Sequence, residues 1–230
     1  MLSQERWILS MYDKMFLTGC DDKTEWMLKW WLSNFKKYNS QKIPVCLANF
    51  GMSNEMLEWA EDQFDVIIHL TPHKNKGWFL KPQSMIEASK YSKKVCWLDT
   101  DCEILRPIGT IFNYSIENKL GMVEDKPWTK RRGEVWHNSG VVLIEGCPTI
   151  LKEWKDAIAT KPTVGDQEVL HSMIGGDHLK RRVYINDLPP YYNWLRLQLL
   201  DGDDTGKKKI VHWTGNKGKD VIRRYIDNGK

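Results

Sequence analysis

The chain lacks the features that mark several classes of protein. Its five cysteines include no Cys-x-x-Cys pair and are odd in number, so we expect a reduced, intracellular protein rather than a disulfide framework. No apolar run approaches the roughly 20 residues that a membrane-spanning helix needs. Gln4, Glu5 and Arg6 precede any apolar run, so we expect no signal peptide. With no repeats and no low-complexity linkers, residues 1–230 are expected to form one cytoplasmic domain with a substantial core.

A large excess of charge of one sign is also missing. The 34 Lys and Arg residues and the 30 Asp and Glu residues are scattered, and the formal net charge is +4. This balance is consistent with an anionic small molecule such as a nucleotide, and it argues against a nucleic-acid partner. Tryptophan, in contrast, is abundant, with 12 residues. Indole faces stack on sugar rings and nucleobases but also fill cores, so this count favours a carbohydrate or nucleotide ligand only slightly.

Short apolar runs in the first half of the chain alternate with amphipathic segments. The runs predict strands at 15–18, 43–50, 66–70 and 95–98. The run at 66–70 is unbroken, as in a sheet that is covered on both faces. Because the segments between the runs have helical spacing, the sequence predicts an α/β fold with a mostly parallel central sheet and Rossmann-like winding.

Other local signals predict further helices and loops. A short leading helix is expected within 1–14, and Asp22 is expected to cap a helix at about 23–38. Ser53 and Pro82 mark the starts of two more helices. In the less regular second half, we expect a solvated loop at 130–133 and, after a last strand, a glycine-containing loop at 214–219.

Two carboxylates follow the predicted strand at 95–98. Asp99 and Asp101 are separated by one residue, and in an extended chain residues i and i+2 point to the same face. Two acceptor-only groups at the carboxyl end of a buried strand suit a hard divalent cation such as Mg²⁺ or Mn²⁺. Open α/β sheets also bind their ligands at this end of their strands. A bare Asp-x-Asp is more often a polar turn, so the interpretation depends on the rest of the chain.

Four further motifs surround this pair. Lys81 lies on the predicted helix before the strand, and Asn138-Ser139-Gly140 precedes an apolar run. Asp166-Gln167 opens a predicted helix, and His212-Trp213-Thr214-Gly215 ends the last predicted strand. Each motif alone is weak, because Asp166 fits an ordinary N-cap and an Asn-Ser-Gly sequence fits a turn. Their order along the chain is more specific.

In this order the motifs resemble those of the GT-A glycosyltransferases, and among these glycosyltransferase family 8 best. The resemblance covers roughly 15–219 and implies a single GT-A domain of the nucleotide-diphospho-sugar transferase type. It implies a nucleotide-binding half at about 15–104 and a sugar and acceptor half at about 105–219. The implied reaction moves a hexose from a nucleotide sugar, UDP-linked, to a glycan or other hydroxyl acceptor, with retention of configuration. The small size resembles that of viral and bacterial members, and a viral source would imply the host cytoplasm.

The same resemblance implies a metal site. Asp99, Asp101 and His212 would hold Mn²⁺, or Mg²⁺, together with the diphosphate of the donor. Two carboxylates and a neutral imidazole are a suitable set for Mn²⁺. A divalent ion there would neutralise the pyrophosphate and stabilise the leaving diphosphate.

The resemblance also assigns residues to the donor. Lys81 would lie near the donor as a point charge for a phosphate, and Asn138 would line the donor sugar. Asp166 and Gln167 would act as the catalytic pair beside the reacting carbon. The remaining expected contacts are Thr18 and Asp21 with the base or ribose, and Tyr191, Tyr192 and Trp194 as a stacking platform for the acceptor.

The last motif departs from the family pattern. The family usually has Lys-Pro-Trp beginning six residues after the histidine, whereas Gly218 stands at that position here. Gly215 keeps its place in the motif, but either Lys217 or Lys219 is open as the lysine that reaches the phosphate.

Two other classes of protein fit parts of the sequence. Phosphatases of the haloacid-dehalogenase type also use Asp-x-Asp after an apolar strand, with Asp203-Asp204 as the later acidic pair. Their motif, however, normally follows the first strand, and here it follows the fourth. A non-catalytic carbohydrate-binding module would account for the tryptophans. It would not account for Asp99, Asp101 and His212, which we call the metal-type trio. We therefore expect a glycosyltransferase.

Overall fold

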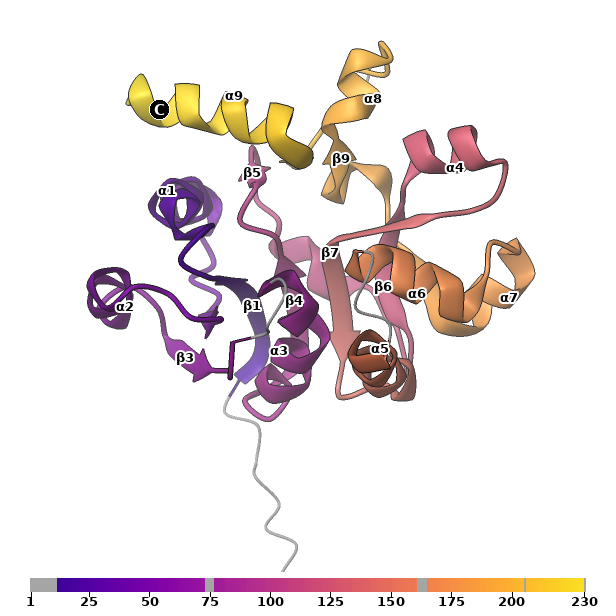
Figure 1. The fold of residues 1–230 in the computed structure, drawn as a ribbon, viewed down its shortest axis with the longest axis horizontal. Coiled ribbons are helices and arrows are strands. Elements are labelled where there is room, and N and C mark those ends of the chain that lie inside the picture. The colour runs from indigo at the N-terminus through magenta and orange to yellow at the C-terminus, as the bar shows by residue number, and fades with distance from the viewer. Residues whose placement is uncertain (1–11, 73–76, 161–164, 205, 230) are drawn as a thin grey trace, which may run out of the picture.

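The computed structural model describes residues 12–72, 77–160, 165–204 and 206–229. Within these residues, a seven-stranded sheet has the order β3-β2-β1-β4-β7-β6-β8 (Figure 1). Its strands are β1 (Tyr12–Cys20), β2 (Val45–Asn49), β3 (Val66–His69), β4 (Ser92–Leu98), β6 (Leu120–Glu124), β7 (His137–Glu145) and β8 (Ile185–Asp187). β7 runs antiparallel to its neighbours β4 and β6, and the other pairs are parallel. The predicted α/β class with a mostly parallel central sheet is therefore confirmed.

A smaller, three-stranded sheet has the order β5-β10-β9. Its strands are β5 (Cys102–Ile104), β9 (Trp194–Leu195) and β10 (Ile210–His212). β10 pairs antiparallel with β5, and His212 lies opposite Cys102. The backbone N–H of Trp213 donates to the carbonyl of Asp101 at 2.9 Å. These bonds hold the C-terminal part of the chain against the turn that follows β4.

Helices pack on both faces of the large sheet. The helices of the described residues are α1 (Leu28–Tyr38), α2 (Asn54–Glu61), α3 (Lys81–Ala88), α4 (Lys126–Arg132), α5 (Thr149–Thr160), α6 (Asp166–Ile174), α7 (His178–Tyr184), α8 (Arg196–Leu200) and α9 (Gly215–Asp227). The 3₁₀ turns are η1 (Glu25–Met27), η2 (Gly77–Leu80), η3 (Gly109–Asn113) and η4 (Pro190–Tyr192). Side chains of β1 alternate between two cores, as a strand's period of two requires. Phe16 packs in the core that contains α1, whereas Met15 and Leu17 pack in the core that contains α3 and α5.

The strand β4 ends in a tight turn. The N–H of Asp99 donates to the carbonyl of Gly140 at 2.8 Å, and the N–H of Cys102 donates to the carbonyl of Asp99 at 3.0 Å. The expected convergence of Asp99 and Asp101 thus arises from a turn between β4 and β5, and not from extended chain. Pairing of β5 with β10 then fixes the direction of this turn.

The start of the chain differs from the prediction. Residues 1–11 of the expected leading helix lie outside the described residues, and 12–14 belong to β1. The helix expected at 23–38 begins later, with η1 followed by α1. Asp21, and not Asp22, makes the local side-chain bonds, because its Oδ1 accepts from the Thr24 hydroxyl at 2.7 Å.

Two segments expected to be loops are helical. Residues 130–132 form the last turn of α4, where their positive charges interact favourably with the negative end of the helix dipole. Asp125 caps α4 by accepting from the Trp128 N–H at 3.1 Å, and Gly133 ends it with a φ of 70°. Residues 215–219 begin α9.

The strand β3 is more exposed than predicted. It lies at the edge of the sheet, and only Ile68 is buried among its four residues. The unbroken apolar run therefore reflects strand preference at an edge and not burial on both faces. None of the described helices has the length and apolar character needed to cross a bilayer.

Candidate active site

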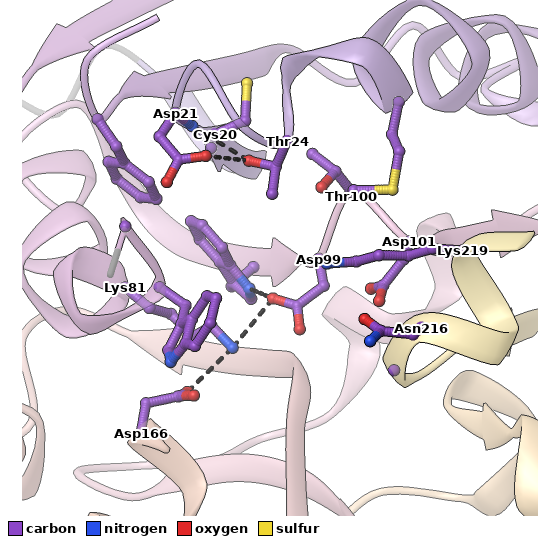
Figure 2. A pocket seen from close by; sticks show the side chains of 17 residues that line it. Cys20, Asp21, Thr24, Lys81, Asp99, Thr100, Asp101, Asp166, Asn216 and Lys219 are labelled. Atoms are coloured by element: carbon purple, nitrogen blue, oxygen red, sulfur yellow. Dashed lines mark hydrogen bonds and ion pairs between the residues drawn. The ribbon is translucent and has the colours of Figure 1, made fainter. Parts of the chain in front are cut away.

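Two adjoining cavities lie at the carboxyl ends of β1 and β4. The first has a volume of about 340 Å³ and is lined by the ends of these strands and the starts of α3, α6 and α9 (Figure 2). The second, of about 320 Å³, is lined by β7 and the starts of α4 and α6. Both are lined by Trp78, Asp99, Asp166 and Gly215. The cavities therefore meet at two of the predicted site carboxylates.

The Lys81 ammonium lies between two carboxylates, as Figure 2 shows. Its Nζ is 3.0 Å from Asp99 Oδ1 and 3.0 Å from Asp166 Oδ2, and it donates to the Ser139 carbonyl at 2.9 Å. Burial lowers the pKa of Lys81, but the Asp166 and Asp99 carboxylates outweigh burial and hold this pKa above its ordinary value. Because an ammonium has three donors, these acceptors occupy it. Lys81 thus orients two carboxylates, whereas sequence reasoning expected it to reach a phosphate.

Of the three predicted metal ligands, Asp99 and Asp101 both lie near His212. His212 Nε2 lies 3.0 Å from Asp101 Oδ1 and 3.7 Å from Asp99 Oδ2. Burial lowers the pKa of His212, but the Asp101 and Asp99 carboxylates outweigh it and raise this pKa above its ordinary value. Burial likewise raises the pKa of Asp101, and the His212 imidazole outweighs it and holds this pKa below its ordinary value. The fold therefore places His212, from the last motif, beside the Asp-x-Asp pair.

The bonds around Asn138 fix which nitrogen of His212 faces the carboxylates. The backbone N–H of Gly140, which can only donate, donates to Asn138 Oδ1 at 2.9 Å, so this atom is the amide oxygen. His212 Nδ1 lies 3.0 Å from the same oxygen and 3.2 Å from Asn193 Oδ1, so Nδ1 carries a hydrogen. In a neutral imidazole the lone pair is then on Nε2, which points at Asp101. This arrangement is typical of a metal-binding histidine.

These residues fit a divalent cation. A buried Nε2 lone pair that faces carboxylate oxygens is unfavourable unless a cation or a proton lies between them. The Cys102 thiol also lies near, with its sulfur within 4.8 Å of the ligand atoms of Asp101 and His212. Burial holds the pKa of Cys102 well above its ordinary value, so this sulfur is a thiol and not a thiolate ligand. Asp99, Asp101 and His212 are the better set.

Two of the residues expected at the donor sugar, Asn138 and Gln167, belong to one polar network. Gln167 Oε1 accepts from Asn138 Nδ2 at 3.0 Å and from the Ser139 N–H at 3.3 Å. Gln167 Nε2 donates to Asp125 Oδ2 at 3.1 Å, and Asn138 Nδ2 donates to the same oxygen at 3.2 Å. Because Asn138 also contacts His212, the network connects the second cavity to the metal-type trio.

The remaining expected contacts divide into two groups. Asp21 lines the first cavity, whereas Thr18 is fully buried beneath it and donates its hydroxyl to the Leu98 carbonyl at 2.8 Å. Gly215 and Lys219 line the first cavity, and Lys217 is exposed and lines neither. Figure 2 shows Lys219 and Asn216 on the side of the cavity where Asp101 lies. The structure therefore favours Lys219 over Lys217 and does not support a nucleotide contact for Thr18.

The three aromatic side chains expected as a platform for the acceptor lie outside both cavities. Tyr192 is 1% exposed and Trp194 is 6% exposed, and both pack in the interior. Tyr191 is half-buried, and its hydroxyl bonds to the Tyr114 hydroxyl at 3.2 Å. None of these three rings lines either cavity. The described aromatic rings that do line the second cavity are Trp78 and Trp128.

Solved structures share the arrangement of the chain. No protein-family model matches the sequence, and no curated protein matches it. The structure is similar to that of the galactosyltransferase LgtC in complex with donor and acceptor sugar analogues, with a TM-score of 0.61 and 13% identity over 93% of this chain and 94% of that one. It is also similar to a glycosyltransferase involved in glycosylation of the major capsid of PBCV-1, with a TM-score of 0.60 and 13% identity over 94% and 99% of the chains. For the glycosyltransferase GlyE of Streptococcus pneumoniae TIGR4, the TM-score is 0.64 and the identity is 14%, over 95% of this chain and 64% of that one. The chain has the GT-A fold.

Within this GT-A fold, several residues that line the cavities or bond to residues that line them had no clear signal in the sequence. Asp125 has the position of an ordinary N-cap before Lys-Pro, and Asn193 lies in an aromatic-rich segment. The sequence places Trp97 in an apolar run and Trp78 in a loop before a helix, and neither position indicates a cavity. Asn193 is 0% exposed and donates to Asn138 Oδ1 at 2.9 Å, which no local spacing could reveal.

The acidic pair of the phosphatase alternative lies elsewhere in the GT-A fold. Asp203 and Asp204 line neither of the two cavities. Asp203 Oδ2 accepts from Gln198 Nε2 at 3.1 Å and so stabilises the segment after α8. The structure therefore gives this pair a structural contact and no role beside Asp99.

A buried arginine links two histidines behind the second cavity. Arg181 is 1% exposed, and it donates through Nε to His137 Nδ1 at 2.9 Å and lies 3.1 Å from His171 Nδ1 through NH1. The other ring nitrogens face carboxylates, with His137 2.6 Å from Asp187 and His171 3.0 Å from Glu134. Burial lowers the pKa of Arg181 to about 10. Since Arg181 keeps its protons, each imidazole must accept at Nδ1 and is neutral.

This link predicts a loss of stability in mild acid. Burial and the Arg181 charge hold the pKa of His137 and of His171 below the ordinary value, so the unfolded chain binds protons more readily than the folded one. The stabilisation is complete above about pH 6.5 and is lost as the pH falls below it. We expect the Tm to fall between about pH 7 and pH 5, and to fall further in the wild type than in a variant that lacks one of the two histidines. Differential scanning calorimetry of the wild type and of His171→Gln measures the fall in Tm. An equal fall in both proteins would show that His171 does not contribute to the loss of stability in acid.

Proposed function

We propose that the protein is a metal-dependent glycosyltransferase that moves a sugar from a nucleotide-sugar donor, UDP-linked, to a hydroxyl of a glycan or similar acceptor. The observation that carries the proposal is that the Asp99 and Asp101 carboxylates both lie near His212 Nε2, beside two cavities of a GT-A fold. The similar solved structures are named as glycosyltransferases, and one contains donor and acceptor sugar analogues. The closest resemblance of the sequence motifs, to family 8, supports transfer with retention of the anomeric configuration, which NMR of the early product tests directly.

These three side chains would hold Mn²⁺ or Mg²⁺. Bound there, the ion would supply positive charge to the diphosphate that leaves as the glycosidic bond breaks. Asp99 offers Oδ2, Asp101 its carboxylate and His212 its Nε2 lone pair, which the Asn138 and Asn193 contacts direct. Lys219, at the edge of the first cavity, would add an ammonium to the same phosphates. Positive charge on both sides of the pyrophosphate favours its departure.

The two cavities would divide the substrates between them. The first would hold the nucleotide, with Asp21 near the base or ribose. The second would hold the sugar to be transferred and the acceptor hydroxyl, beside Asn138, Asp166 and Gln167. Their amide and carboxylate groups have fixed orientations, so they would position hydroxyl groups of the sugar at the junction of the cavities.

Thermal shift measurements with UDP, GDP and CMP, each with and without Mn²⁺, test the proposal. We expect UDP with Mn²⁺ to raise the Tm, because a ligand at about 100 times its Kd adds about 2.7 kcal/mol of stability. For a chain of this size, that corresponds to roughly 5–10 °C. Asp101→Ala should remove the shift, and Asp22→Ala, which changes an exposed carboxylate outside both cavities, should keep it.

If no nucleotide changes the Tm under any condition, the proposal is wrong. A metal-dependent hydrolysis of phosphate esters without nucleotide binding would instead favour the phosphatase alternative. A shift with sugars alone would favour a carbohydrate-binding module.

A further inference from the structure

The two oxygens of the Asp99 carboxylate have different surroundings. Oδ1 accepts from the indole N–H of Trp97 at 2.6 Å and is 3.0 Å from Lys81 Nζ. Oδ2 is the oxygen nearest to His212, at 3.7 Å from its Nε2. One oxygen is therefore held by two strong donors, and the other faces the metal-type trio.

The Trp97 ring is fixed in place. Trp97 lies two residues before Asp99, so its side chain points to the same face of β4, which pairs with β1 on one side and β7 on the other. The ring is 2% exposed and is stacked on Phe50 at 6.2 Å with an angle of 13° between the planes. Lys81 Nζ lies 5.6 Å from the ring centroid. The indole N–H therefore has one available direction, toward Asp99.

We propose that Trp97 is a positioning residue for the metal, because its indole N–H aims the Asp99 carboxylate. With Oδ1 occupied by Trp97 and Lys81, Oδ2 is left as the single oxygen that Asp99 presents to the ion. An indole N–H only donates, so it cannot compete with Asp99 as a ligand. Lys81 alone would hold Oδ1 through a flexible chain, whereas the indole fixes the plane of the carboxylate. This inference rests on the metal site of the proposed function and adds a residue to it.

Two substitutions separate the N–H from the bulk of the ring. Trp97→Phe keeps an aromatic ring against Phe50 and removes the N–H. Trp97→His loses bulk but keeps a donor, because Nε2 of histidine occupies the ring position of the indole nitrogen. Trp31→Phe is the matched control, since the Trp31 indole is also fully buried but its nitrogen has no hydrogen-bond partner among the described residues.

The affinity for Mn²⁺ alone is measured by electron paramagnetic resonance of free Mn²⁺, with circular dichroism showing that each variant is folded. Loss of a residue that orients a metal ligand typically weakens metal binding by roughly 10- to 100-fold. We expect a rise of at least about tenfold in Kd for Trp97→Phe, a smaller rise for Trp97→His and no change for Trp31→Phe.

The outcomes distinguish this inference from the proposed function. If the wild type binds Mn²⁺ and Trp97→Phe binds it equally well, Trp97 has no positioning role and the metal site stands. If Trp97→His loses affinity as much as Trp97→Phe does, packing and not the N–H is responsible, which also overturns the inference. If the wild type binds no Mn²⁺, the metal site itself is wrong. If Trp97→Phe does not fold, the indole ¹H–¹⁵N signal of Trp97 in the wild type is followed by NMR instead. If Mg²⁺ binds the protein and this signal does not shift, the inference is overturned.

Discussion

Gly140→Ala is expected to abolish Mn²⁺-dependent binding of UDP. A Cβ atom at this position would lie 2.1 Å from His212 Cε1 and 2.3 Å from His212 Nδ1, far inside van der Waals contact. The imidazole must therefore move, and it loses the contacts that aim Nε2 at Asp101. A displacement of about 1 Å at such a site can cost about a hundredfold, so we expect at least this loss of UDP affinity, measured by titration calorimetry with Mn²⁺.

A double-mutant cycle shows whether His212 carries the effect. If Gly140→Ala acts only by displacing the imidazole, it should add nothing to His212→Ala. Additive losses from the two substitutions would show that Gly140 acts through another residue. Unchanged UDP affinity in Gly140→Ala would contradict the geometry of the trio.

Lys81→Met is expected to destabilise the whole protein strongly. The methionine fits the space but removes the charge that compensates Asp99 and Asp166, of which the Asp166 side chain is only 10% exposed. Removing one member of a buried ion pair typically costs about 3–5 kcal/mol, and we expect a loss near the lower value because Asp99 is partly exposed. Urea denaturation near neutral pH measures the free energy of unfolding.

Two variants test the reason for this loss. In Lys81→Met combined with Asp166→Asn, only the Asp99 carboxylate is left without its lysine partner. This double variant should therefore recover part of the stability. Lys90→Met changes an exposed lysine just after the same helix, α3, and should stay within about 0.5 kcal/mol of the wild type. If the Lys81→Met protein is as stable as the Lys90→Met protein, the ion pairs of Lys81 with Asp99 and Asp166 contribute no net stability.

The sequence was informative where local pattern decides the structure. The buried run before Asp99 predicted β4 and the place of the ligand edge, because strand period and apolar content are properties of neighbouring residues. Asp166 at the start of α6 was found for the same reason. The order of the motifs then predicted the fold, which the solved structures confirm.

Contacts between distant segments were not predictable in this way. The role of Lys81 depends on carboxylates from β4 and α6, and the tautomer of His212 depends on Asn138 and Asn193. Tyr192 and Trp194 were expected at a surface because aromatic side chains serve equally well in cores and in ligand sites. Lys217 and Lys219 became distinguishable only when their segment proved to be the start of α9. In each case, tertiary packing decides between alternatives that the local sequence leaves equal.

The proposed metal ligands come from the turn after β4 and from β10, and this separation has a consequence for the order of events during synthesis. Asp99 and Asp101 emerge from the ribosome well before His212, which reaches them through the pairing of β10 with β5. Domains form as their segments become available, so a nascent chain that ends before β10 has two carboxylates in a turn and no third ligand. The proposed metal site can therefore form only after β10 has been synthesised, and a chain that ends before β10 cannot carry it.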